Sequence, residues 1–247
     1  MIEAYKRYEF RTVHQIEHIF ANSSTTQERI SRFLGCRSEV LHPGIDYKEF
    51  ACRDYKRFFF YPSRIVPEKR FELAIEAFSR FKRMRANGTH GKEKWKLVIA
   101  GSLNRSIPHH AEYAKKIFNL AAHAGDVNVI LDASFAKIRS LYADCYSVLY
   151  TPIHEDFGLV PLEAMASRKP VLAWNEGGPT EIVENGRTGY LVNTVQELTV
   201  RMNSLADTPG IAERMGRAGR KRVETNFGWP RFLKRFEQVC RKLARAH

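Results

Sequence analysis

Two glutamates, Glu155 and Glu163, flank a predicted strand-to-helix turn and are the residues best placed to do chemistry. The apolar run over residues 146–150 is typical of a buried strand, and a helical pattern follows over residues 160–167. Gly158 lies in the turn, so Glu155 belongs to the loop and Glu163 to the helix. Open α/β sheets bind ligands at the carboxyl ends of their strands, which makes this turn a candidate binding site.

The same turn offers backbone groups to an anion. The free N–H groups of Gly158, Leu159 and Val160 begin the predicted helix, where phosphates bind. Two carboxylates beside such a site suit a ligand with both hydroxyls and phosphates, such as a nucleotide sugar. Each carboxylate also has a simpler interpretation, because a lone helical glutamate is usually solvated and a loop glutamate often complements a helix dipole.

Two cations, Arg64 and Lys69, follow another predicted strand, residues 57–61. Arginine presents a planar fork of donors to phosphate, whereas lysine acts as a point charge. Five residues apart in one loop, they are able to converge on one diphosphate. The alternative is that they are two solvated cations among the 40 of the chain.

The elements that would position these side chains form an α/β pattern. Strand-like runs alternate with amphipathic helical patterns, which predicts a Rossmann-like parallel sheet with helices on both faces. The predicted strands cover residues 57–61, 96–100, 127–131, 146–150, 170–174 and 189–192. The predicted helices cover residues 71–84, 109–124, 135–145, 160–167, 195–206, 210–225 and 229–246. Ahead of them, the sequence predicts a helix over 2–17, strands at 16–21 and 40–42, and a helix between those strands.

Composition and charge narrow the class of protein. The chain has 247 residues, 44% of them hydrophobic, which is typical of a folded globular protein. Its formal net charge of +13 favours anionic partners: nucleic acid, an acidic membrane surface or phosphorylated substrates. The four cysteines show no metal-ligand spacing and indicate a reducing compartment. With no secretory leader and no stretch of about 20 apolar residues, we expect a cytoplasmic protein, with peripheral membrane contact as a further option.

The turn around Glu155 resembles a known motif. Residues 155–166 match Glu-x-Phe-Gly-Leu-x-x-x-Glu-Ala-Met-Ala, the Glu-x7-Glu pattern of retaining glycosyltransferases of the GT-B fold, in particular family four and its mannosyltransferases. Three further elements are similar to that family: the Arg64-x4-Lys69 pair, a Pro-Gly-Ile-Asp turn at 43–46, and Gly177-Gly178-Pro179. The Gly-Gly-Pro element has two equally weighted interpretations, a functional one and a turn that supports the site.

The resemblance implies roles for particular residues. Catalysis would depend on Arg64 and Lys69, which hold the donor diphosphate, and on Glu155, which holds sugar hydroxyls. Glu163 would bind the ribose, and the backbone near Phe157, Gly158 and Leu159 would meet the sugar and the diphosphate. No metal and no cofactor is expected, because the two cations stabilise the leaving group.

Two departures from the family pattern concern the donor. Ser63 stands where the family usually has glycine, which narrows the room for a close approach of backbone. A glycine usual near Asp132 or Ala133 is also missing, which leaves the nucleobase open.

The resemblance covers residues 17–243 and corresponds to the carboxyl-terminal, donor-binding half of a GT-B enzyme. We therefore divide the chain into residues 1–20, a remnant of a preceding acceptor domain, and residues 21–247, the donor domain. The acceptor would be held by a missing domain or a partner subunit. The implied reaction is transfer of a hexose, mannose from GDP-mannose, to a glycan or lipid-linked acceptor. The alternative is a non-catalytic subunit that binds a nucleotide sugar, or only supports a partner transferase. Nucleic acid is not an expected partner, because the sequence shows no recognition motif for it.

Overall fold

The computed structural model describes residues 10–87, 93–208 and 210–245. Most of the helix predicted over residues 2–17 therefore lies outside the described residues, and of it the structure shows one helical turn at residues 10–13.

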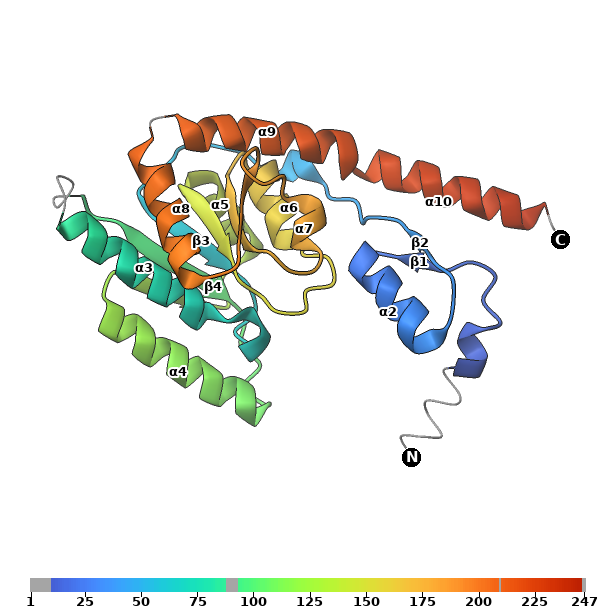
Figure 1. Ribbon diagram of the computed structural model, residues 1–247, viewed down its shortest axis with the longest axis horizontal. Coiled ribbons are helices and arrows are strands. Elements are labelled where there is room, and N and C mark those ends of the chain that lie inside the picture. Colours follow the sequence, from blue (N-terminus) through green and yellow to red (C-terminus); the bar gives the residue numbers. More distant parts are fainter. Residues whose placement is uncertain (1–9, 88–92, 209, 246–247) are drawn as a thin grey trace.

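A parallel six-stranded sheet forms the centre of the molecule (Figure 1). In spatial order its strands are β5 (Val127–Leu131), β4 (Lys96–Gly101), β3 (Phe58–Pro62), β6 (Ser147–Tyr150), β7 (Val171–Trp174) and β8 (Gly189–Val192). All neighbouring pairs are parallel. The predicted fold class, a Rossmann-like parallel sheet with helices on both faces, is confirmed.

Two layers of helices cover the sheet. On one face lie α3 (Phe71–Ala86), α4 (Pro108–Ala124) and α8 (Val195–Asp207), with α3 packed between the other two. On the other face lie α5 (Phe135–Asp144), α6 (Leu159–Ala166) and α9 (Ile211–Asn226), with α6 packed against α9. A short helix, α7 (Pro179–Ile182), precedes β8.

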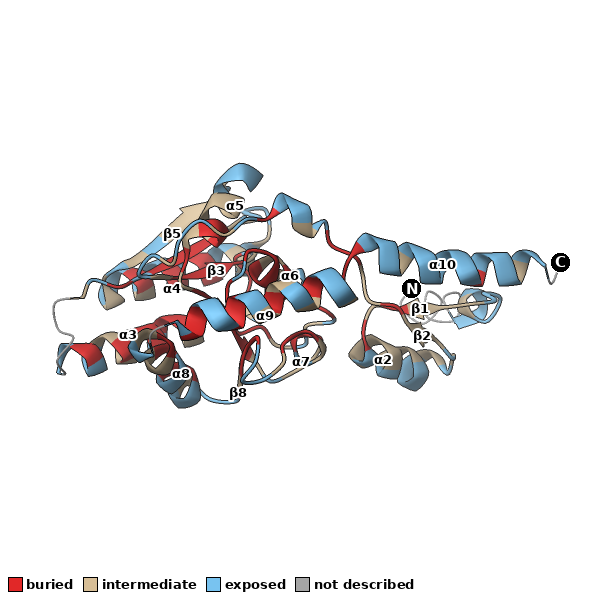
Figure 2. Ribbon diagram, turned by 90° about the horizontal axis from the view of Figure 1, so that it is seen from above, coloured by how far each residue is buried: buried red, intermediate tan, exposed pale blue. Residues whose placement is uncertain are grey.

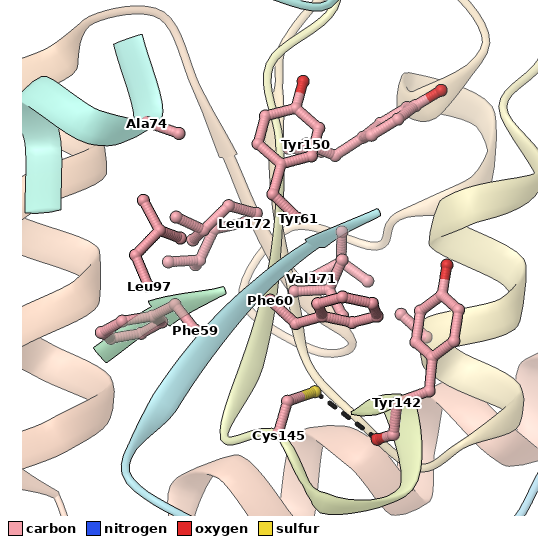
Figure 3. Packing of buried hydrophobic residues seen from close by; sticks show 14 of the residues in the cluster. Phe59, Phe60, Tyr61, Ala74, Leu97, Tyr142, Cys145, Tyr150, Val171 and Leu172 are labelled. Atoms are coloured by element: carbon pink, nitrogen blue, oxygen red, sulfur yellow. Dashed lines mark hydrogen bonds between the residues drawn. The ribbon is translucent and has the colours of Figure 1, made fainter. Parts of the chain in front are cut away.

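The central strand β3 is apolar on both faces, as a parallel strand between two helix layers must be. Phe59 packs against Phe81 and Trp95 on one side, with ring centroids 5.2 Å apart in each pair. Phe60 points to the opposite face and meets Tyr142 of α5 at 5.1 Å (Figure 3). Each fully buried aromatic ring of this kind contributes about 1.5–3 kcal/mol, so β3 anchors both layers.

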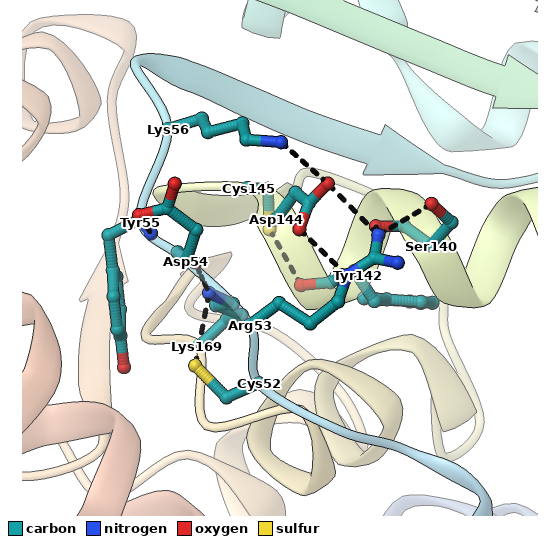
Figure 4. Close-up of polar contacts among 10 residues, drawn as sticks. All are labelled: Cys52, Arg53, Asp54, Tyr55, Lys56, Ser140, Tyr142, Asp144, Cys145 and Lys169. Carbon is teal, nitrogen blue, oxygen red and sulfur yellow. Dashed lines mark hydrogen bonds and ion pairs between the residues drawn. The ribbon is translucent and has the colours of Figure 1, made fainter.

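Polar contacts hold the amino-terminal edge of the sheet, the edge at which its strands begin (Figure 4). Asp144, at the end of α5, accepts hydrogen bonds from Arg53 at 3.0 and 2.9 Å and from Lys56 at 3.0 Å. Lys169, fully buried just before β7, donates to the Asp54 carbonyl and lies 3.8 Å from the centre of the Tyr55 ring. These contacts hold the segments that enter the strands, and leave the carboxyl edge to the loops.

A second, small sheet lies beside the large one (Figure 1). It consists of two parallel strands, β1 (Phe20–Ala21) and β2 (Glu39–Val40), joined by α2 (Ser24–Leu34). Ser23 caps the start of α2 and Gly35, in the left-handed conformation, ends it. The division of the chain at residue 20 stays a prediction. The structure shows that β1, α2 and β2 lie outside the six-stranded sheet.

The last helix, α10 (Trp229–Ala244), runs from the large body along the small sheet (Figures 1 and 2). Phe236 packs on Phe20 of β1 with ring centroids 5.8 Å apart, and Arg235 donates to both oxygens of Glu39 in β2 at 2.5 and 2.7 Å. Within the described residues, no helix is both long and apolar enough to cross a bilayer.

Candidate functional site

The order of the six strands reverses between β3 and β6. From β3 the chain moves outward through β4 to β5, then returns to β6 and continues outward through β7 to β8. At such a reversal the loops after the two central strands diverge and leave a crevice, where α/β proteins bind ligands. Here those loops are residues 63–70 after β3 and residues 151–158 after β6.

Hydrogen bonds tie these two loops together. Arg70 donates from Nε to the Thr151 carbonyl at 2.8 Å and from a terminal nitrogen to the Pro152 carbonyl at 2.9 Å. The Ile153 N–H donates to the Glu68 carbonyl at 2.9 Å. The Arg70 guanidinium also lies 4.7 Å from the centre of the Trp174 ring, at the end of β7. The crevice thus has one continuous, hydrogen-bonded wall.

The hydroxyl of Tyr61, fully buried at the end of β3, completes this wall. It accepts a hydrogen bond from the Thr151 N–H at 3.0 Å and donates to the Lys69 carbonyl. Burial raises the pKa of the Tyr61 hydroxyl, so it remains protonated and keeps its role as a donor.

Lys69 and Glu155, one from each loop, meet in the crevice. The Lys69 ammonium donates to Glu155 Oε2, and the two side chains are only 14% and 19% exposed. Arg64 lies on the same loop as Lys69, but its side chain is exposed and has no ion-pair partner among the residues that the structure describes. The structure therefore joins two of the three predicted catalytic residues directly and leaves the third at the surface of the loop.

Glu163 lies on α6, where its carboxylate is held by Tyr142 of α5. The Tyr142 hydroxyl donates to Glu163 Oε2 at 2.6 Å, which leaves Oε1 for a ligand. Burial raises the pKa of the Glu163 carboxyl, and the hydrogen bond from Tyr142 lowers it in part. Tyr142 is not among the predicted site residues, because in the sequence it is one of several apolar positions of a helix.

We expect Tyr142→Phe to move the pH dependence of ligand binding. Without this hydrogen bond the pKa of Glu163 rises further, and a protonated carboxyl accepts hydroxyl donors poorly. The acid side of the affinity profile for a nucleoside diphosphate should therefore shift to higher pH, while affinity well above the raised pKa stays close to that of the parent chain. Calorimetric titrations of both proteins from about pH 5 to about pH 8, a range that starts just above the usual glutamate pKa, measure this.

The parent chain titrated at each pH serves as the control for protonation of the ligand. Superimposable profiles would contradict the role of Tyr142.

The pH dependence of folding stability that comes from Glu163 has the opposite sign to the pH dependence of binding. A carboxyl whose folded-state pKa is raised stabilises the fold while it is protonated, and this contribution is lost as pH rises through that range.

The loop of residues 155–158 rests on the Gly177-Gly178 turn. The Gly178 N–H donates to the Glu155 carbonyl at 2.9 Å, and a Cβ on Gly178 would overlap the backbone of Phe157. Phe157 is buried and Leu159 is 50% exposed. These contacts favour the interpretation of the glycine turn as a support for the site. Gly158, which precedes α6, has φ of 93°, a conformation that favours glycine.

Both departures from the family pattern are accommodated. The backbones of residues 63 and 101 approach closely, and the glycine that allows this is Gly101, where a Cβ would overlap the Ser63 carbonyl. Asp132, one of the two residues near which a glycine was expected, adopts φ of 52°, so an aspartate takes the left-handed conformation there. Its carboxylate lies 3.9 Å from Arg105.

Among the described residues, no group of three or more histidine, cysteine, aspartate or glutamate side chains is arranged to hold a metal ion. The absence of a metal requirement remains an expectation. The four cysteines are free thiols.

The six-stranded parallel sheet, with its strand order reversed between β3 and β6 and helices on both faces, is the fold of one half of a GT-B glycosyltransferase. The chain belongs to the family described as "Glycosyl transferases group 1", whose sequence model matches residues 46–222.

The relatives with curated names include mannosyltransferases. The chain is 33% identical over 196 residues to the alpha-1,3/1,6-mannosyltransferase ALG2 of Dictyostelium discoideum, covering 77% of this chain and 47% of that protein. It is 30% identical over 188 residues to the human protein of the same name, covering 73% of this chain and 44% of that protein. The chain thus spans about half the length of these relatives.

Solved structures share the fold across nearly the whole chain. Sucrose-phosphate synthase from Thermosynechococcus elongatus superimposes with a TM-score of 0.84 at 20% identity, covering 99% of this chain and 63% of that one. Alr3699/HepE of Anabaena, solved in complex with UDP and glucose, gives 0.78 at 19% identity, covering 97% of this chain and 66% of that one.

Proposed function

We propose that this chain is the donor-binding half of a retaining glycosyltransferase that transfers mannose from GDP-mannose to a glycan or lipid-linked acceptor. The observation that carries the proposal is the meeting of Lys69 and Glu155 from two loops at the strand reversal, with Arg64 on the first loop and Glu163 behind the second. The two cations suit a diphosphate, and the two carboxylates suit sugar and ribose hydroxyls.

In this proposal the protein's main contribution to the chemistry is electrostatic. As the bond between sugar and diphosphate breaks, negative charge grows on the diphosphate, and Lys69 and Arg64 stabilise it. Lys69 must first leave Glu155 or share its ammonium between carboxylate and phosphate. Glu155, held by the Gly178 N–H through its carbonyl, is then free to accept sugar hydroxyls. These cations supply the charge that a metal ion supplies elsewhere, so no metal is required.

The choice of mannose is supported by the relatives, whose names include mannosyltransferases. The acceptor half is proposed to be a second domain or partner that contacts α10. The exposed side chains of Trp229, Leu233 and Phe236 lie along that helix at 45%, 55% and 43% exposure, and such apolar stripes suit a protein partner.

We expect GDP-mannose to bind more tightly than UDP-glucose, UDP-GlcNAc or ADP-glucose. The base and sugar of the matching donor fill the crevice, whereas a mismatched base leaves buried polar groups unpaired. Isothermal calorimetry of the chain with the four donors, and with GDP and UDP alone, measures this. Tighter binding of UDP than of GDP would overturn the choice of donor.

Three controls accompany the panel. Glu163→Ala should weaken every nucleotide if binding is in the crevice. Single-stranded RNA, titrated at two salt concentrations, tests whether the charge of +13 alone explains binding, because contacts with a phosphate backbone weaken steeply with salt. Repeating the titration with a chelator tests the expected independence from metal.

A further inference from the structure

The Glu181 carboxylate links the small sheet to the turn that supports the Glu155–Gly158 loop. It accepts hydrogen bonds from the Ser24 N–H at 2.8 Å and the Ser24 hydroxyl at 3.2 Å, at the start of α2. It also lies 2.8 Å from His42 Nε2. Glu181 follows the Gly177-Gly178 turn, so one carboxylate ties α2 and the segment after β2 to the turn that supports the Glu155–Gly158 loop.

His42 contacts that loop directly. Its ring stacks on Phe157, with centroids 5.5 Å apart and planes at 16°. It also meets Phe227 at 5.5 Å, and the Phe227 ring lies 6.2 Å from that of Phe157, so the three rings form one cluster. A third link comes from Arg29 of α2, which pairs with Asp156. The small sheet and the segment after it therefore contact the Glu155–Gly158 loop at Asp156 and Phe157. Through Glu181 they also contact the Gly177-Gly178 turn that supports this loop.

The Gly177-Gly178 turn and the Glu155–Gly158 loop are hydrogen-bonded to each other and therefore behave as one unit. The Gly178 N–H is bonded to the Glu155 carbonyl, and the His154 N–H donates to Glu176 at 3.2 Å. Turn and loop are thus joined on both sides of Glu155. The side chain of Glu155 is in turn the partner of Lys69.

The chain crosses between the two sheets at one place. Residues 41–46 lead from the small sheet to the large body, and residues 226–229 lead back toward α10 (Figure 1). Ile45 and Gly228 form an isolated parallel bridge, and the Ile45 N–H donates to the Phe227 carbonyl at 2.8 Å. We take these two adjacent crossings as the hinge about which the small sheet would turn, and His42 lies beside them.

We propose that His42 and Glu181 are positioning residues that form a clamp between the small sheet and the Glu155–Gly158 loop. Through it, the orientation of β1–α2–β2 about the hinge sets the geometry of Glu155 and of the backbone that meets the sugar. The effect on nucleotide-sugar affinity rests on the proposed function. The effect on the loop itself does not.

The test uses hydrogen exchange and calorimetry on the whole chain. The variants are His42→Ala, which removes the contacts of His42 with Glu181, Phe157 and Phe227, His42→Phe, which keeps the ring stack and loses the nitrogen, and Glu181→Gln, which loses the charge. His123→Ala, at an exposed site on α4, is the matched control. We expect amide exchange over residues 154–160 to rise by about tenfold in His42→Ala and Glu181→Gln, as loss of a charged hydrogen bond produces, with a smaller rise in His42→Phe. Affinity for GDP-mannose should fall by about fivefold or more in the first two variants and stay unchanged in the control.

Unchanged exchange in both His42→Ala and Glu181→Gln overturns the clamp, as does weaker binding with no change in exchange. If the parent chain binds no nucleotide, the proposed function fails, while the exchange result still decides the clamp. Thermal unfolding of each variant shows whether it is folded. Should His42→Ala unfold, Ser24→Ala, which removes one donor to Glu181 at an exposed position, provides the same comparison.

Discussion

Lys69→Ala is expected to weaken binding of a nucleoside diphosphate by about 1.5–3 kcal/mol, the loss produced by removal of a charge-assisted hydrogen bond. Arg64→Ala should cost a similar amount. The Lys69 variant has an additional effect, because the Glu155 carboxylate, 19% exposed, loses its counter-ion and then repels the incoming phosphates. We therefore expect the Lys69 variant to be the weaker binder of the two. Calorimetric titration with GDP measures both.

The structure supplies a matched control and a partial rescue. Arg241→Ala removes an exposed arginine of α10 that pairs only locally with Glu237, and it should leave affinity unchanged. The double variant Lys69→Ala/Glu155→Ala removes the repelling carboxylate as well, so it should bind GDP more tightly than Lys69→Ala. Unaltered affinity in both Arg64→Ala and Lys69→Ala would remove the diphosphate role from this loop.

The second large effect concerns turnover. The 247-residue chain alone is expected to bind donor but to transfer sugar slowly or not at all. Holding two reactants in place contributes about 7–11 kcal/mol to lowering a barrier, and the proposed site among the described residues binds the donor only. The open crevice also leaves the diphosphate in water, where Arg64 and Lys69 stabilise the leaving group less.

Transfer of mannose to a lipid-linked oligosaccharide is the measurement, with and without an acceptor domain supplied in trans. A chain carrying Glu163→Ala is the control for donor binding. Robust turnover by the parent chain alone would refute this prediction and would show that the chain carries its own acceptor site.

Much of the large sheet was predictable, because its strands are short apolar runs bounded by turn residues. The predicted ends of all six strands lie within one residue of the observed ends. Arg64, Lys69, Glu155 and Glu163 were predictable as candidates because each lies at a fixed offset from the end of a strand.

The partners of these residues were not predictable in the same way. Tyr142 meets Glu163 across 21 positions, and His42 and Ser24 meet Glu181 across 139 and 157. Local periodicity carries no information on such pairs. His42 reaches the site through the fold rather than through a sequence motif.

The local sequence pattern also does not show which sheet a predicted strand joins. The strands predicted at 16–21 and 40–42 are observed as the two-residue strands β1 and β2, paired with each other and not with the large sheet. A short apolar run predicts a strand, but the register and the neighbour depend on distant segments.

The small sheet also affects how cooperatively the molecule unfolds. None of the α2 side chains is buried, and β1 and β2 contain two residues each. This part therefore depends on its contacts with α10 and with the loops of the large body, at Asp156, Phe157 and Glu181. Such a unit opens at a lower free energy than a core built on Phe59, Phe60 and Tyr61. Trp95 lies in that core and Trp229 begins α10, so the two tryptophans report on different cooperative units. We therefore expect the two units to unfold separately rather than with a single melting midpoint.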